Sequence, residues 1–116
     1  MSDLFTELRH FTGSGEVFIH SLNRSFVYTE GVQYMAEKAS AYWLIDYILS
    51  YQHLAEVRAE PFQTWKLKVK DNEGIMTLTD GNKRIIKTFK IAFTDFPLEK
   101  ISLWLIDKTL MLPSEY

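Results

Sequence analysis

The stretch AYWLIDYILSYQHLAEVRAEPFQTWKLKVK, residues 41–70, contains the point at which the hydrophobic period of this chain changes. From residue 31 to residue 59, apolar side chains recur every three or four positions, as they do in an amphipathic helix. From residue 62 to the C-terminus they alternate with polar side chains, as they do in half-buried strands. One helical block followed by a run of strands predicts a small α+β domain.

Length and composition limit the classes of protein to which the chain can belong. A chain of 116 residues that is 47% hydrophobic and 15% aromatic can bury one core, so we expect a single domain over residues 1–116. The first residues include Asp3 and Glu7 where a secretory signal would be basic, and there is no cysteine. The longest apolar stretch, residues 41–51, is too short for a membrane helix. These features predict a cytoplasmic protein without a membrane partner.

The N-terminal half of the chain is predicted to be mainly helical. Apolar residues at helical spacing within residues 4–11 predict a short N-terminal helix, and the β-branched and aromatic residues of segment 16–29 predict a hairpin. Thr29 is the predicted N-cap of the main helix, which is expected to break near Ser40. Because that helix is apolar around much of its circumference, we expect it to lie centrally against an antiparallel sheet.

Six segments along the chain carry a family resemblance: Phe11-Thr12-Gly13, Tyr28-Thr29-Glu30-Gly31-Val32, Ala41-Tyr42-Trp43-Leu44-Ile45-Asp46, Trp65-Lys66-Leu67, Thr94-Asp95-Phe96-Pro97-Leu98 and Leu112-Pro113-Ser114-Glu115-Tyr116. They resemble a family of small bacterial proteins, domain of unknown function family 6876, found in cyanobacteria and on mobile elements. The resemblance spans almost the whole chain. It implies a stand-alone domain, and it supplies no activity, cofactor or catalytic residue.

Asp46 is the only charged residue between Ala41 and Tyr51. A buried carboxylate costs several kcal/mol unless it is paired or hydrogen-bonded, so Asp46 either turns to an exposed edge or has a dedicated partner. We therefore expect Asp46 to have a tertiary partner: a hydroxyl, a backbone amide, or an Arg or His side chain from the strands or from segment 16–29. The alternative is that Asp46, with a nearby Tyr or His, forms the site of a small-molecule enzyme.

Residue patterns that would demand a particular chemistry are absent from the sequence. The three histidines, His10, His20 and His53, lack the spacing of metal ligands on one helix. No cysteine is present, and no serine lies in a Gly-x-Ser-x-Gly motif. The sequence therefore predicts no catalytic residue, no metal and no cofactor.

Basic residues concentrate in the predicted strands. Residues 66–90 hold seven basic side chains against three acidic ones. Lys66, Lys68 and Lys70 alternate along one strand, and Lys87 is expected on the same basic face. Single-strand nucleic-acid binders add exposed aromatic side chains on the basic face, whereas here the aromatic side chains are expected largely on the opposite face. A solvated face that blocks edge pairing is therefore the favoured interpretation.

Aromatic residues are dense in the main helix and just before it. Six lie between residues 28 and 51, more than one helix usually buries, so some of them are expected to line a groove or an interface. We therefore predict a non-enzymatic protein-interaction module, a regulator or inhibitor, and leave self-association open. The alternatives are a nucleic-acid-associated protein using the basic face and an enzyme centred on Asp46. The predicted binding residues are Tyr28, Tyr42, Trp43, Asp46 and Tyr47.

Overall fold

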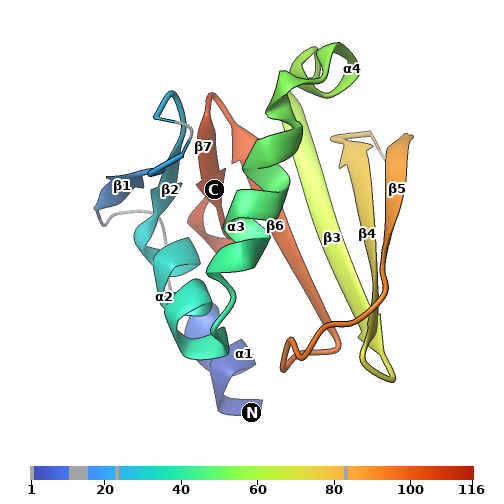
Figure 1. The fold of residues 1–116 in the computed structure, drawn as a ribbon. Coiled ribbons are helices and arrows are strands. Elements are labelled where there is room, and N and C mark those ends of the chain that lie inside the picture. Colours follow the sequence, from blue (N-terminus) through green and yellow to red (C-terminus); the bar gives the residue numbers. More distant parts are fainter. Residues whose placement is uncertain (1, 11–15, 23, 83) are drawn as a thin grey trace.

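One mixed sheet and two layers of structure make up the fold (Figure 1). The computed structural model describes residues 2–10, 16–22, 24–82 and 84–116. The helical elements in this part of the chain are α1 (Ser2–Leu8), α2 (Glu30–Ala39), α3 (Tyr42–Ser50), η1 (Tyr51–His53), α4 (Ala55–Arg58) and η2 (Pro113–Glu115). The strands are β1 (Val17–Ile19), β2 (Val27–Thr29), β3 (Phe62–Lys70), β4 (Glu73–Asp80), β5 (Ile85–Ile91), β6 (Lys100–Ile106) and β7 (Thr109–Met111). The predicted α+β class is confirmed.

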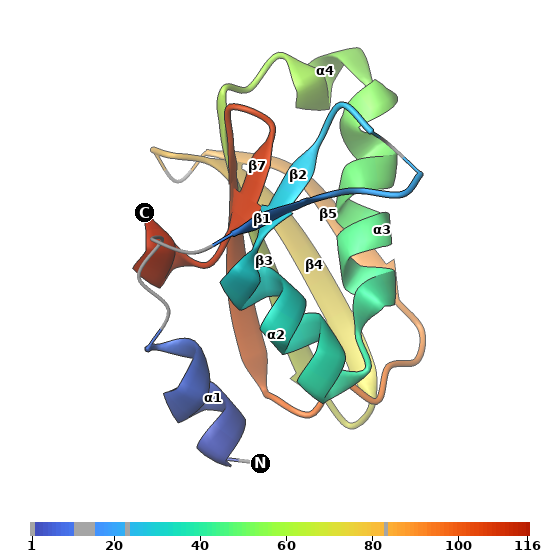
Figure 2. The same ribbon diagram turned by 90° about the vertical axis from the view of Figure 1, so that its left-hand side faces the viewer.

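The predicted single main helix is in fact two helices, α2 and α3. Ser40 ends α2 in the left-handed conformation, with φ of 53°, and its backbone N–H donates to the Ala36 carbonyl oxygen. The buried Ala41 then leads into α3. The break near Ser40 is confirmed, but its consequence is a correction: two helices of different direction, rather than one central helix, cover the sheet (Figures 1 and 2).

The sheet is mixed rather than purely antiparallel. Its strand order is β1-β2-β7-β6-β3-β4-β5, and β2 and β7 run parallel, with Val27 opposite Thr109. The predicted hairpin is present, because β1 and β2 pair antiparallel with Val17 opposite Thr29. A parallel pair needs a long crossover connection, and here most of the chain separates β2 from β7. Local sequence patterns carry no signal for such a distant pairing.

The core lies between the sheet and the α2–α3 layer. Alternate residues of β3, β4 and β6 point into it, and the apolar side of α3 closes it. Its largest fully buried side chain is Trp65, whereas Trp43 is only half-buried. The core residues from these elements include Leu44, Ile45, Ile48, Leu49, Trp65, Leu67, Met76, Leu78, Leu103 and Leu105.

A buried polar network fastens the end of α3 to β3. The side-chain amides of Gln52 and Gln63 exchange two hydrogen bonds of 3.0 Å, and the indole N–H of Trp65 donates to the Gln63 Oε1 atom at 2.9 Å. Gln63 also donates to the Val57 carbonyl oxygen at 2.9 Å. Because these amide groups are satisfied, their burial does not carry the cost of unpaired polar atoms.

The predicted N-terminal helix is present as α1, and Leu4 and Leu8 are buried in the core. The helix ends at Leu8, earlier than predicted, because the Arg9 and His10 N–H groups bond three residues back in a turn; residue 11 itself lies outside the described residues. Figure 2 shows α1 and the C-terminal turn η2 on the side away from α3. Among the described residues, no helix has both the length and the apolar character needed to cross a membrane.

The C-terminal segment is held against the start of α2 by one carboxylate. Glu115 accepts hydrogen bonds from the Thr29 hydroxyl, from the Gly31 N–H at 3.1 Å and from the Leu112 N–H at 2.9 Å. Thr29 is the predicted N-cap, which is confirmed because its Oγ1 accepts from the Val32 N–H. An anion at a helix N-terminus is favoured by the unpaired N–H groups and by the helix dipole. A Cβ atom on Gly31 would lie 2.7 Å from the Glu115 Oε1 atom, so glycine permits the contact.

We predict that Gly31→Ala lowers the free energy of unfolding by about 0.5–2 kcal/mol, measured by urea denaturation. Displacing the carboxylate removes charged hydrogen bonds of about 1.5–3 kcal/mol, and the higher helix propensity of alanine offsets about 1 kcal/mol of that loss. In a Glu115→Ala background the same substitution should be neutral or stabilising, because no carboxylate remains to be displaced. Equal destabilisation in both backgrounds would contradict this account of the contact.

Candidate functional site

The sheet face that points away from α2 and α3 carries a polar and basic surface. Alternation along β3 directs Trp65 and Leu67 into the core and Lys66 and Lys68 outward. The strand register then brings Thr77 and Ser102 beside Lys66. We call this surface the open sheet face; it comprises Phe62, Thr64, Lys66, Lys68, Lys70, Glu73, Ile75, Thr77, Thr79, Ile85, Thr88, Lys90, Lys100, Ser102 and Trp104.

Two lysines face each other directly at the end of the β3–β6 pairing. Lys68 of β3 lies opposite Lys100 of β6. The next pair in the register, Val69 and Glu99, is joined by a 2.7 Å backbone hydrogen bond. Because hydrogen-bonded and non-hydrogen-bonded pairs alternate along antiparallel strands, Lys68 and Lys100 form a non-hydrogen-bonded pair, the type in which opposite side chains lie closest. Like charges in that position destabilise a sheet. Within the described chain neither lysine has an ion-pair partner, so an anion bound between them would relieve the repulsion.

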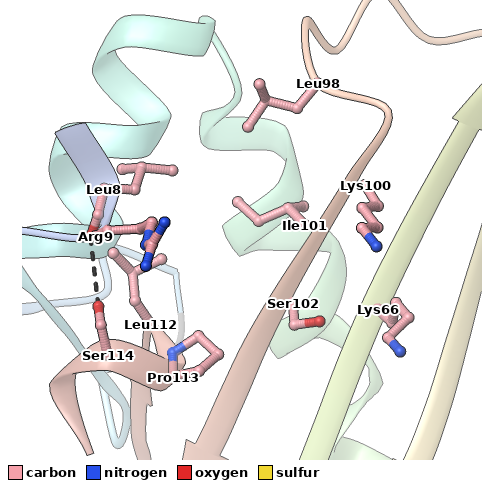
Figure 3. Close-up of a pocket in the computed structure, with 10 residues that line it drawn as sticks. All are labelled: Leu8, Arg9, Lys66, Leu98, Lys100, Ile101, Ser102, Leu112, Pro113 and Ser114. Atoms are coloured by element: carbon pink, nitrogen blue, oxygen red, sulfur yellow. Dashed lines mark hydrogen bonds between the residues drawn. The ribbon is translucent and has the colours of Figure 1, made fainter. Parts of the chain in front are cut away.

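A hollow of about 340 Å³ adjoins the open sheet face, between the end of α1, η2 and β6. Figure 3 shows Arg9 on one side of it and Lys66 and Lys100 on the other. The Ser114 hydroxyl, also in its lining, donates to the Leu8 carbonyl oxygen at 3.4 Å. Its size falls in the range of small-molecule and side-chain pockets. No carboxylate is among the described residues that line it; its apolar lining consists of Leu8, Leu98, Ile101, Leu112 and Pro113.

Aromatic side chains lie at one end of the open sheet face, contrary to the expectation that they lie largely on the opposite face. The ring centroid of Trp104 lies 5.2 Å from that of Phe62 and 5.5 Å from that of Tyr116. Phe62 and Trp104 occupy the outward phase of β3 and β6, the same phase as Lys66. Tyr116 reaches them only because η2 turns the C-terminus over this edge, which strand alternation does not predict.

Three of the four lysines of the predicted basic face lie on one surface in the structure. Lys66, Lys68 and Lys70 lie on the outward side of β3, as predicted, but Lys87 does not belong to this surface. Its register partner is the fully buried Leu78, so Lys87 points to the helix side, where its Nζ atom lies 2.9 Å from Glu56 Oε1.

Lys100 and Arg9 were missing from the predicted set. Lys100 begins a strand in which residues 101, 103 and 105 are the buried phase, so alternation could have identified it. Arg9 follows α1 and reaches the hollow only through tertiary packing, for which the sequence has no signal.

The predicted aromatic binding residues do not form one surface. On α3, Tyr42 and Asp46 lie on one side of the helix, and Trp43 and Tyr47 on another, where they line a shallow hollow with Phe93. Tyr28, on β2, packs against Phe18 with ring centroids 5.8 Å apart. These residues therefore remain candidate binding residues, but they lie on separate parts of the surface.

Two of these tyrosines have phenols held in the protonated form. The hydrogen bond from the Tyr42 hydroxyl to Glu37, 2.8 Å long, raises the pKa of Tyr42 to about 12. Burial, followed by the contact with Tyr51, raises the pKa of Tyr47 above its ordinary value. Neither phenol can act as a base near neutral pH.

Asp46 has the tertiary partner that was predicted for it. The Nε2 atom of His20, in the segment just after β1, lies 2.6 Å from the Asp46 Oδ1 atom. The histidine side chain is 5% exposed and that of Asp46 is 51% exposed, so the contact lies at the edge of the core. His53 lines a shallow hollow together with His20 and Asp46, but its Nδ1 atom donates to the Ser50 carbonyl oxygen at 2.6 Å. In the described ranges no three His, Cys, Asp or Glu side chains gather as metal ligands would. The contact joins the hairpin to α3.

We predict that Asp46→Asn lowers the free energy of unfolding by about 0.5–1.5 kcal/mol, because a charged hydrogen bond to His20 becomes a neutral one. Asp95→Asn is the matched control, since Asp95 is exposed, and it should leave the urea midpoint unchanged. If the two variants unfold at the same midpoint, the contact does not stabilise the fold. If Asp46→Asn is stable but loses partner binding, Asp46 is a site residue.

Comparison with known proteins places the chain in a family without an assigned activity. Searches of the curated proteins and of the solved structures found no match. A family profile described as "Family of unknown function (DUF6876)" matches residues 2–116, which is nearly the whole chain. This match includes the segments 28–32 and 112–116, which the Glu115 carboxylate joins in the fold. The chain therefore belongs to the DUF6876 family of unknown function.

Proposed function

We propose that this protein is a non-enzymatic interaction module that binds an acidic partner protein through its open sheet face. The observation that carries the proposal is the Lys68–Lys100 pair, two like charges placed directly opposite each other, neither of which forms an ion pair within the described residues. Glu73 and Glu99 line a hollow together with these lysines but do not pair with them. Lys66, and Arg9 across the adjoining hollow, extend the same positive surface. Complementary charge of this kind steers and selects a partner. A regulatory or inhibitory role in the cytoplasm is part of the proposal.

The aliphatic side chains among the lysines of the open sheet face favour a protein partner over a nucleic-acid partner. Ile75 and Ile85 lie on the open sheet face with 49% and 63% of their surface exposed. Aliphatic side chains among cations suit a protein partner, whose interface combines apolar and polar groups. A single-stranded nucleic acid instead needs separate aromatic faces along the basic groove. Here Phe62, Trp104 and Tyr116 pack on one another at one end.

We predict that the double substitution Lys68→Gln/Lys100→Gln weakens binding of fluorescein-labelled poly-L-glutamate about tenfold, measured by fluorescence anisotropy at physiological salt. This change corresponds to about 0.7 kcal/mol from each lysine. Lys87→Gln is the matched control, because Lys87 lies in the same sheet on the helix side, and its variant should bind as the wild type does. Equal affinities for the double variant and the wild type would overturn the proposal.

We also predict that labelled oligodeoxythymidine binds only at a salt-sensitive background level, with a Kd of about 100 μM or weaker. The same anisotropy measurement over a series of salt concentrations checks this. Submicromolar binding at physiological salt that is lost in Lys68→Gln/Lys100→Gln would instead support the nucleic-acid alternative.

A further inference from the structure

The strand β7 ends before it has covered the edge of β6. The two strands pair from Trp104 opposite Met111 to Ile106 opposite Thr109. Two more residues in this register would place Pro113 opposite Ser102, but proline has no N–H to donate, and the chain turns into η2 at that point. Among the described residues, the first residues of β6 therefore have β3 on one side and no strand on the other.

The backbone groups of Lys100 and Ser102 face this uncovered edge. The bond from the Val69 N–H to the Glu99 carbonyl oxygen shows that residue 99 points its backbone toward β3. In an antiparallel pair this direction alternates, so residues 100 and 102 point theirs away from β3. Within the described residues, no backbone hydrogen bond from outside the strands reaches either of them. The edge thus presents unpaired donors and acceptors.

Beside this edge, the hollow between α1, η2 and β6 forms a slot, and the two sides of this slot carry different side chains. Lys66 and Lys100 lie on the outward side, with Arg9 across the hollow (Figure 3). The inward side is formed by the buried side chains of Leu8, Ile101 and Leu112. Successive residues of a strand point to opposite faces. A strand laid in this slot would meet cations with one set of side chains and an apolar wall with the other.

We propose that the β6 edge from Lys100 to Ser102 takes up an extended segment of an acidic partner as an added strand, in which acidic and apolar residues alternate. The acidic side chains meet Lys66, Lys100 and Arg9, and the apolar ones enter the hollow. Backbone hydrogen bonds to the strand edge provide the affinity, and the hollow provides the specificity, as in other cases of strand addition. This inference rests on the proposed function and names the part of the partner that is bound.

The test uses a short fluorescein-labelled peptide of alternating Glu and Val and compares Ser102→Pro with Ser102→Ala in the full chain. Both substitutions remove the hydroxyl, but only proline removes the N–H at the edge, and it breaks no bond to β3 because that N–H points away from it. We expect Ser102→Pro to bind about tenfold or more weakly than Ser102→Ala, the difference being due to the lost N–H. In the wild type, the Ser102 amide should exchange its hydrogen more slowly when the peptide is bound. This second measurement does not depend on the folding of the proline variant.

The outcomes separate this inference from the proposed function. Equal affinities of the proline and alanine variants, or an unprotected Ser102 amide, would overturn strand addition. If Lys68→Gln/Lys100→Gln weakens binding of the peptide while Ser102→Pro does not, the open sheet face remains the binding surface and only strand addition fails. Binding of poly-L-glutamate without binding of the peptide likewise overturns strand addition alone. If neither probe binds the wild type, both proposals fail.

Discussion

The carboxylate of Glu115 at the N-terminus of α2 is the contact on which the arrangement of the C-terminal half depends. It satisfies the Gly31 N–H and the Thr29 hydroxyl, and it also accepts from the Leu112 N–H of its own turn. The start of the helical layer and the end of the chain thereby share one anion, which the orphan N–H groups of a helix favour. The contact lies beside the parallel β2–β7 pair and fixes the course of the chain after β7.

This course explains why the candidate site is open. Had β7 continued in register along β6, Glu115 would lie opposite Lys100 and would neutralise it. Instead the chain turns at Pro113, and the Glu115 carboxylate accepts a hydrogen bond from the Gly31 N–H at the start of α2. Lys100 is left facing Lys68, and the β6 edge is left without a strand. The positive surface and the strand edge therefore have one cause, the withdrawal of the C-terminal residues from the sheet.

A binding role accounts for these features better than catalysis does. The pKa values of Tyr42 and Tyr47 are raised, so these phenols stay protonated, and Asp46 is engaged by His20. The open sheet face offers cations, hydroxyls and aliphatic groups over an extended area, which suits recognition of a large charged partner.

The sequence by itself determined the α+β class, the cap at Thr29, the break at Ser40 and the outward direction of Lys66 and Lys68, because each depends on local period or local backbone chemistry. It also pointed to a partner for Asp46, but the buried member of that pair is His20, because the Asp46 side chain is 51% exposed. Only the tertiary structure decided that β2 pairs with β7, that Lys87 points to the helix side and that Arg9 meets the lysines. These features depend on strand register and on contacts between segments that are distant in the sequence. Loop closure and packing of the whole chain select them, so no short stretch of sequence carries a signal for them.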